Sequence, residues 1–98
     1  MNREVKKSMK EVRSEIDQID KDLVSLLAKR QKYIENAALI KKDRNLIIDK
    51  ARIEEVISNI KKLSSSSGLS EAISEPLWRK LIELSIEHEF EEFERKKN

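Results

Sequence analysis

The sequence has little of what sheets, disulfides and metal clusters require: it contains no cysteine, one glycine and one proline in 98 residues. The absence of cysteine excludes disulfides, thiolate zinc sites and a cysteine nucleophile, and the lone His88 cannot by itself form a histidine metal cluster. One glycine and one proline cannot supply the turns of a sheet, whereas Leu, Ile, Lys, Glu and Arg are abundant, as in long helices. We therefore expect an all-α protein without a metal site.

Charge and hydropathy argue against nucleic-acid-binding and membrane proteins. The 21 Lys and Arg are evenly mixed with 19 Asp and Glu, and the net charge of +2 argues neither for nucleic acid nor for an anionic membrane. No stretch approaches the roughly 20 apolar residues that span a bilayer, and residues 1–15 carry one charge after another, so we expect neither a membrane span nor a leader. We expect a soluble, cytoplasmic protein that forms a single domain over residues 1–98. With 38% hydrophobic and 4% aromatic residues, part of its burial is expected to come from a partner chain.

The first helical pattern runs from Val5 to about Arg44 without Gly or Pro. Its apolar positions recur at three- and four-residue spacing: Met9, Val12, Ile16, Ile19, Leu23, Leu26, Tyr33, Ala37 and Ile40. Forty helical residues extend about 60 Å, whereas a compact monomer of this length has a radius of gyration of about 13 Å. The pattern favours an intertwined homodimer in which two long helices cover each other's apolar faces. A spectrin-like protein or a simple coiled coil explains the same pattern at this stage.

Two shorter helices follow. Asp49 stands at the N-cap position of the second, which is expected to end in a loop formed by Ser64–Ser67 and Gly68. Ser70 and Ser74 are both candidate caps for the third helix. Because Pro76 is best tolerated in a first turn, the continuous part is expected to begin near Ser74, after a separate short turn.

At the C-terminus, residues 94–98 are expected to fray.

Several polar residues stand in the apolar phase of these helices. Arg30 interrupts the first helix, and Lys41 lies eleven residues further, about 20° around the helix and about 16 Å along it. Ser85 and Glu89 share a face of the third helix with Trp78. Arg30 could simply extend its charged end into water, and Glu89 could form a structural ion pair with Arg30 or Lys41. Together, however, the four polar side chains describe a lined cavity in a helical bundle.

Two more arginines could reach this cavity. Arg52 faces the same direction as Val56, and it lines the cavity with the four polar side chains if the second helix packs across the first. Arg13 lies 17 residues before Arg30, about 25 Å along the same helix. If Arg13 belongs to this cavity, it must come from the partner chain of a dimer.

The sequence resembles the all-helical chorismate mutase family, the AroQ class, which includes isochorismate-pyruvate lyases. The resemblance covers nearly the whole chain without gaps. The motifs that carry it are VRSEIDQID at 12–20, LVSLLAKR at 23–30, Ala37-Ala38 before Lys41, Asp49 with Arg52, Gly68-Leu69, and LWRKLI at 77–82 leading to Ser85 and Glu89.

This resemblance implies an intertwined homodimer that converts chorismate to prephenate without metal or cofactor. It implies that Arg13 crosses to the partner's site, that Arg30 binds a substrate carboxylate, and that Lys41 binds the ether oxygen and a carboxylate. Asp49 and Arg52 would flank the ring, Ser85 would line the pocket, and Glu89 would face the ether oxygen.

Two positions depart from the family pattern. Many members have Glu after the arginine at the start of the second helix, where it binds the substrate hydroxyl, but here Ile53 follows Arg52. Isochorismate-pyruvate lyases also have an aliphatic residue there. Glu89 stands where many members have Gln, and a carboxyl must be protonated before it can donate to the ether oxygen. The alternatives are therefore a lyase, a mutase for a related chorismate derivative, and a non-catalytic helical dimer module.

Overall fold

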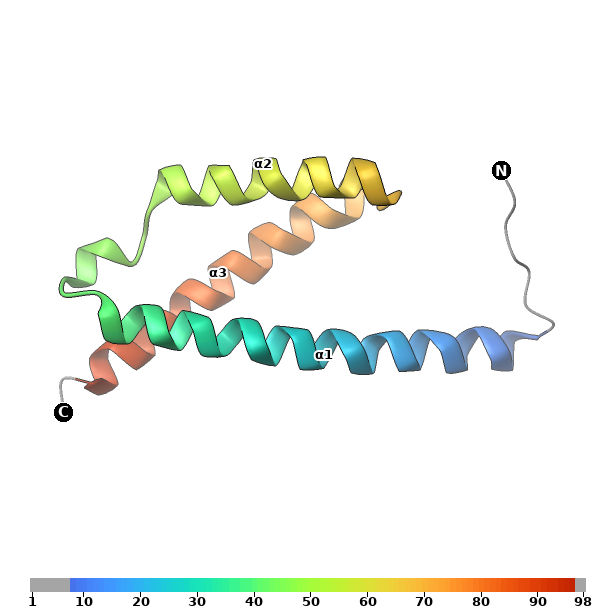
Figure 1. Ribbon diagram of the computed structural model, residues 1–98, viewed down its shortest axis with the longest axis horizontal. Helices are drawn as coiled ribbons and strands as arrows, with labels where there is room; N and C mark the ends of the chain where they lie inside the picture. The colour runs from blue at the N-terminus through green and yellow to red at the C-terminus, as the bar shows by residue number, and fades with distance from the viewer. Residues whose placement is uncertain (1–7, 97–98) are drawn as a thin grey trace. The chain divides into compact units, whose positions relative to one another are not determined.

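The computed structural model describes residues 8–96, which form three α-helices and one short 3-10 helix (Figure 1). The elements are α1 (Met9–Ile40), η1 (Arg44–Leu46), α2 (Lys50–Ser67) and α3 (Glu71–Lys96). No strand occurs among these residues. The prediction of an all-α fold with one long N-terminal helix and two shorter ones is confirmed.

The C-terminal end of the first helix differs from the prediction. The expected start at Val5 lies outside the described residues, and α1 ends at Ile40 rather than near Arg44. The chain leaves the helix because Asp43, in an extended conformation, caps η1: its carboxylate accepts a hydrogen bond of 2.8 Å from the Asn45 amide.

The chain divides into two compact units, Met1–Lys32 and Tyr33–Asn98, and each is described by itself. In the first unit, the apolar side chains of α1 remain substantially exposed, including Ile19 at 57% and Leu26 at 60%. Such an apolar face on a helix is typical of a surface that packs against another chain.

The second unit has a small core. Ala38 from α1, Ile47 and Phe93 from α3 are buried together, and Ile86 and Phe90 pack against them. α2 contacts α3, and the two helices follow each other across a short turn, from which they diverge (Figure 1). This core fixes the end of α1 against α3, where the candidate site lies.

α2 begins as predicted and ends later than predicted. Asp49 is its N-cap and accepts a hydrogen bond of 3.0 Å from the Arg52 amide. Gly68 ends the helix in the left-handed conformation, with φ of 82°, which favours glycine. The prediction that Ser64–Ser67 form a loop was wrong, because these residues are the last turn of α2.

Buried hydroxyls explain this extra turn. Ser64 Oγ lies 2.7 Å from both the Ile60 carbonyl oxygen and Ser74 Oγ. Since each hydroxyl has one hydrogen, Ser64 donates to the carbonyl and Ser74 donates to Ser64. Ser74, which was a candidate cap, is instead a fully buried link between α2 and α3.

α3 starts earlier and continues further than predicted. It begins at Glu71, where Ser70 Oγ accepts a hydrogen bond of 3.2 Å from the Ala72 amide. Pro76 therefore lies inside the helix. The fold tolerates it because the carbonyl that loses its helical donor belongs to the exposed Ala72 and can bind water.

The predicted fraying of residues 94–98 is wrong up to Lys96, where α3 ends, and positions 97–98 lie outside the described residues. Lys96 Nζ donates hydrogen bonds to the carbonyls of Ala38 (2.5 Å) and Lys41 (2.6 Å). Helix C-termini leave carbonyls without donors, and α1 has no basic residue of its own in its last turn. Lys96 therefore completes the end of α1 and fixes the backbone of Lys41.

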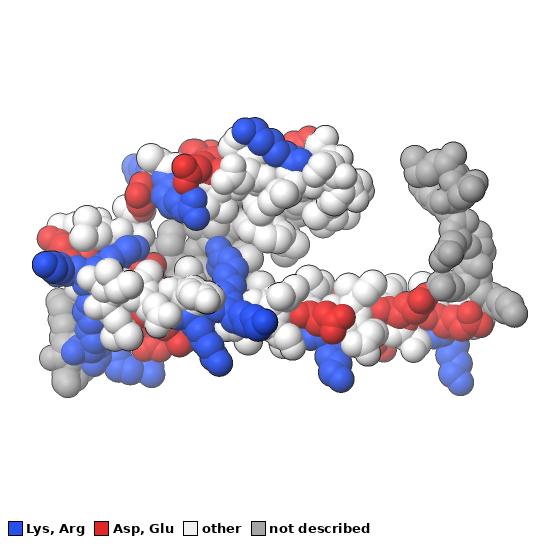
Figure 2. All heavy atoms as spheres, viewed as in Figure 1, with Lys and Arg blue, Asp and Glu red and all other residues white. Residues whose placement is uncertain are grey.

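Basic and acidic side chains are interspersed on the face shown in Figure 2, as the nearly balanced charge predicts. Within residues 8–96, no helix is long and apolar enough to cross a membrane.

Candidate functional site

The candidate site is built around an ion pair between the end of α1 and the middle of α3. Lys41 Nζ lies 2.7 Å from Glu89 Oε2, and the Glu89 side chain is only 6% exposed, whereas that of Lys41 is 26% exposed. The charged end of Lys41 is thus within reach of solvent while Glu89 is enclosed. These are two of the residues that the helical phase identifies as polar groups in apolar positions.

The contact between them is electrostatic rather than a well-formed hydrogen bond. Glu89 Oε2 is buried and has no hydrogen-bond partner among the described residues, although Lys41 Nζ is within ion-pair distance. An incompletely satisfied buried carboxyl oxygen is unfavourable for folding. Such groups call for an explanation, of which a ligand-binding role is one.

Ser85 lies one turn before Glu89 on α3. Its hydroxyl donates a hydrogen bond of 2.7 Å to the Leu81 carbonyl, and the residue is partly exposed. This bond within the helix orients the hydroxyl oxygen.

Asp49 and Arg52 make local contacts at the start of α2. Asp49 uses its carboxylate as the helix cap, and the exposed guanidinium of Arg52 pairs with Glu55 one turn further along α2. Ile53 is partly buried. The structure thus gives Asp49 a folding role, and roles toward a ligand stay predictions for both residues.

Arg13 and Arg30 belong to the first unit. Arg13 is exposed, and Arg30 is partly buried, with burial lowering the pKa of its guanidinium from the usual value. An arginine remains a cation despite such a shift. Of the seven predicted site residues, the second unit thus brings Lys41 and Glu89 into contact, while the transfer of Arg13 to a partner chain stays a prediction.

A comparison with family models identifies the chain. The model described as Chorismate mutase type II matches residues 12–90. The chain belongs to the chorismate mutase type II family. No curated protein gives a significant match.

The part that matches chorismate mutase type II contains every predicted site residue: Arg13, Arg30, Lys41, Asp49, Arg52, Ser85 and Glu89. It also contains Ile53. The predicted resemblance is confirmed at the level of the family.

Other charged contacts of this chorismate mutase family member were missed by sequence reasoning. Arg44 pairs with Glu94 and lies 4.5 Å from the centre of the Phe90 ring. His88 Nε2 lies 2.6 Å from Glu35. These pairs join residues about 50 positions apart, so helical periodicity gives no signal for them.

Proposed function

We propose that the protein is a chorismate mutase that converts chorismate to prephenate, a pericyclic Claisen rearrangement in aromatic amino-acid biosynthesis. The observation that carries this proposal is the contact of Lys41 with the buried Glu89. The family resemblance implies that both of these groups face the ether oxygen of the substrate. Family membership over residues 12–90 supports the substrate class.

The chemistry requires positioning and charge rather than a covalent intermediate. The ether C–O bond breaks while a C–C bond forms, and no proton, electron or cofactor is exchanged. Negative charge develops on the ether oxygen, where the ammonium of Lys41 stabilises it. Glu89 donates a hydrogen bond to the same atom only when its carboxyl carries a proton. Holding the flexible substrate in its reactive conformation supplies the rest of the acceleration.

The remaining assignments concern how the dianion is held. Arg30 and Arg13 each bind a carboxylate, because the planar guanidinium presents two parallel donors to both carboxylate oxygens. Arg52 and Asp49 flank the ring, and Ser85 lines the pocket.

We also propose a homodimer in which Arg13 completes the site of the partner subunit. The exposed apolar face of α1 supports this arrangement, with Ile16, Ile19, Leu23 and Leu26 each between 48% and 60% exposed. A second copy of the same helix presents the same apolar face and covers it in a two-fold dimer.

A second candidate function is that of an isochorismate-pyruvate lyase. The observation that favours it is Ile53, an aliphatic and partly buried residue where many mutases have a carboxylate for the substrate hydroxyl. A mutase acting on a related chorismate derivative accounts for the same residue.

The test is to incubate the purified protein separately with chorismate and with isochorismate. We expect prephenate from chorismate and little salicylate or pyruvate from isochorismate. Salicylate and pyruvate as the faster products establish the lyase. Turnover of neither substrate contradicts both activities and favours a derivative of chorismate or the non-catalytic dimer module.

A further inference from the structure

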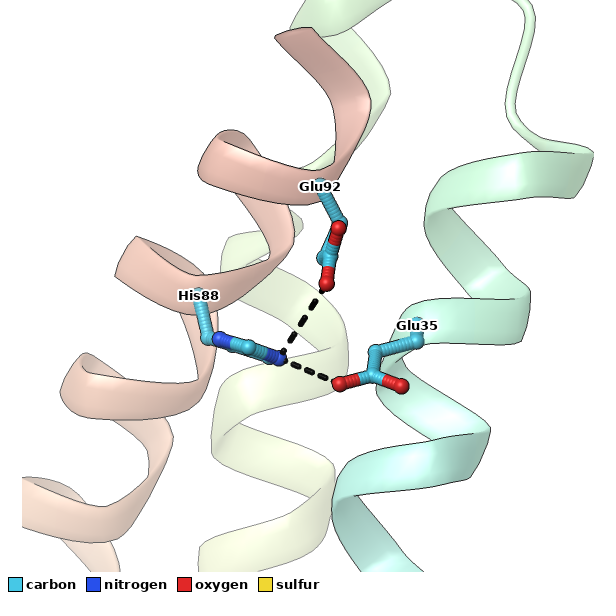
Figure 3. A group of neighbouring side chains, drawn as sticks. All are labelled: Glu35, His88 and Glu92. Carbon is cyan, nitrogen blue, oxygen red and sulfur yellow. Dashed lines mark hydrogen bonds and ion pairs between the residues drawn. The ribbon is translucent and has the colours of Figure 1, made fainter. Parts of the chain in front are cut away.

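A second group of polar side chains lies outside the proposed chorismate site. Glu35 near the end of α1 and His88 and Glu92 on α3 each direct one potential metal ligand to a common point, and these atoms lie within 4.8 Å of one another. Figure 3 shows the three side chains pointing toward one another from the two helices. His88 Nε2 is 2.6 Å from Glu35 Oε2 and 3.8 Å from Glu92 Oε1.

Contrary to the expectation from the sequence, we propose that Glu35, His88 and Glu92 form a binding site for a divalent transition-metal ion of the Zn²⁺ type. Two carboxylates and a neutral imidazole carry a charge of −2, which balances a divalent cation. Zinc accepts nitrogen and carboxylate oxygen ligands at about 2.0–2.2 Å, so neighbouring ligands of a tetrahedral ion lie about 3.4 Å apart. The contacts of 2.6 and 3.8 Å bracket that distance, and all three ligand atoms lie within 4.8 Å of one another, so the side chains would adjust around the ion.

The surroundings allow an ion to enter. The three side chains are between 22% and 32% exposed, and Glu35 and Glu92 also line a depression of about 260 Å³ with Leu39, Arg95 and Lys96. Water in this depression can complete the coordination. The two carboxylate oxygens of Glu92 have different partners: Oε1 faces His88, and Oε2 lies 3.7 Å from Arg95 Nε.

The imidazole ligand decides the class of ion. Mg²⁺ and Ca²⁺ prefer all-oxygen ligands, whereas imidazole favours zinc and its neighbours in the first transition series. The helical i, i+4 spacing of His88 and Glu92 fixes two ligands on one face of α3, and Glu35 supplies the third from α1. A bound ion would therefore join the last turns of α1 to α3, as a stabilising rather than a catalytic element.

The alternative occupant of this point is a proton, which would make His88 a cation held between two carboxylates. The experiment distinguishes the two. The untagged full chain is titrated with Zn²⁺ in competition with a chromophoric chelator, and with Co²⁺ while the imidazole proton signals are followed by NMR. Because His88 is the one histidine in the sequence, every histidine signal reports on this site.

We expect one Zn²⁺ per chain, a Co²⁺-induced shift of the His88 signals, and a melting temperature that rises with Zn²⁺ but not with Mg²⁺. His88→Gln, Glu35→Gln and Glu92→Gln should each weaken Zn²⁺ binding about tenfold or more. Glu87→Gln, an exposed neighbour on α3, is the matched control and should bind as the wild type does.

Circular dichroism establishes that each variant is folded. If His88→Gln does not fold, Glu92→Gln serves in its place, because it preserves shape at a partly exposed position. Absence of Zn²⁺ binding, unchanged His88 signals with Co²⁺, or equal affinity in the control and ligand variants overturns the proposal.

Discussion

Lys41 Nζ contacts Glu89 Oε2 at 2.7 Å, and this oxygen is buried without a hydrogen-bond donor among the described residues. The pair joins the end of α1 to α3 at a point fixed by Lys96, which binds the Lys41 carbonyl. A dianionic substrate at Lys41 must share this cation with Glu89, and an ionised Glu89 repels the charge that develops on the ether oxygen. A hydrogen-bond donor in place of the Glu89 carboxylate should therefore favour the proposed reaction.

Replacing Glu89 by Gln should raise mutase activity at pH 8 by about tenfold, because an amide donates to the ether oxygen at any pH. Initial rates of prephenate formation at pH 8 measure the change, with Glu87→Gln as control. A rate for Glu89→Gln at or below that of the wild type contradicts this role.

Arg13 and Lys41 of different chains should together form one site. Arg13→Ala and Lys41→Ala should each be nearly inactive as homodimers. After the two variants are mixed, unfolded and refolded together, half of the dimers are mixed and each has one intact site, so activity should return to about a quarter of wild type. If Arg13 serves its own chain, no mixed dimer has an intact site and the mixture stays inactive.

Acid should weaken the contact between α2 and α3. Arg79 donates hydrogen bonds of 3.1 and 3.2 Å to Glu54 across the two helices and one of 3.1 Å to Glu75. The hydrogen bond from Arg79 lowers the pKa of Glu54, and Lys61, followed by Arg79, lowers the pKa of Glu75. Since both carboxyls have a depressed pKa in the folded state, their stabilisation is present above the ordinary carboxyl pKa of about 4.3 and is lost as the pH falls through the folded values.

Arg79→Gln should accordingly lower the melting temperature by a few degrees at pH 7, because the network is exposed and screened by solvent. The difference from wild type should shrink toward pH 3. Thermal melts followed by circular dichroism at both pH values measure it. Lys80→Gln, which among the described residues loses a contact with Glu83 within α3, is the control. A deficit that stays equal at pH 3 contradicts the electrostatic origin.

The sequence predicts the helices well where local chemistry decides. The lack of Gly and Pro and the Asp49 cap indicate three helices and the start of α2, and Gly68 is left-handed as expected. The prediction fails at Ser64–Ser67 and at the start of α3. There, a hydrogen bond between the buried Ser64 and Ser74 allows a serine-rich turn to remain helical, and such a tertiary contact leaves no local signal.

The candidate site, like the helices, is predictable from the sequence only in part. Lys41 and Glu89 stand in apolar phase, which marks them as inward-facing polar groups, and the structure pairs them. The contacts of Lys96 with α1 depend on where α3 meets α1. The approach of His88 to Glu35 depends on the same packing, and accordingly no metal site was predicted there from the sequence.

The most direct test of the proposed function compares prephenate formation by the wild type, Lys41→Ala and Lys42→Ala. Lys42 is the exposed neighbour of Lys41 and provides a matched loss of one charge. We predict that the wild type and Lys42→Ala convert chorismate at similar rates, while Lys41→Ala loses about 10²–10³-fold in kcat. Equal turnover by folded Lys41→Ala, or no prephenate from the wild type, contradicts the account.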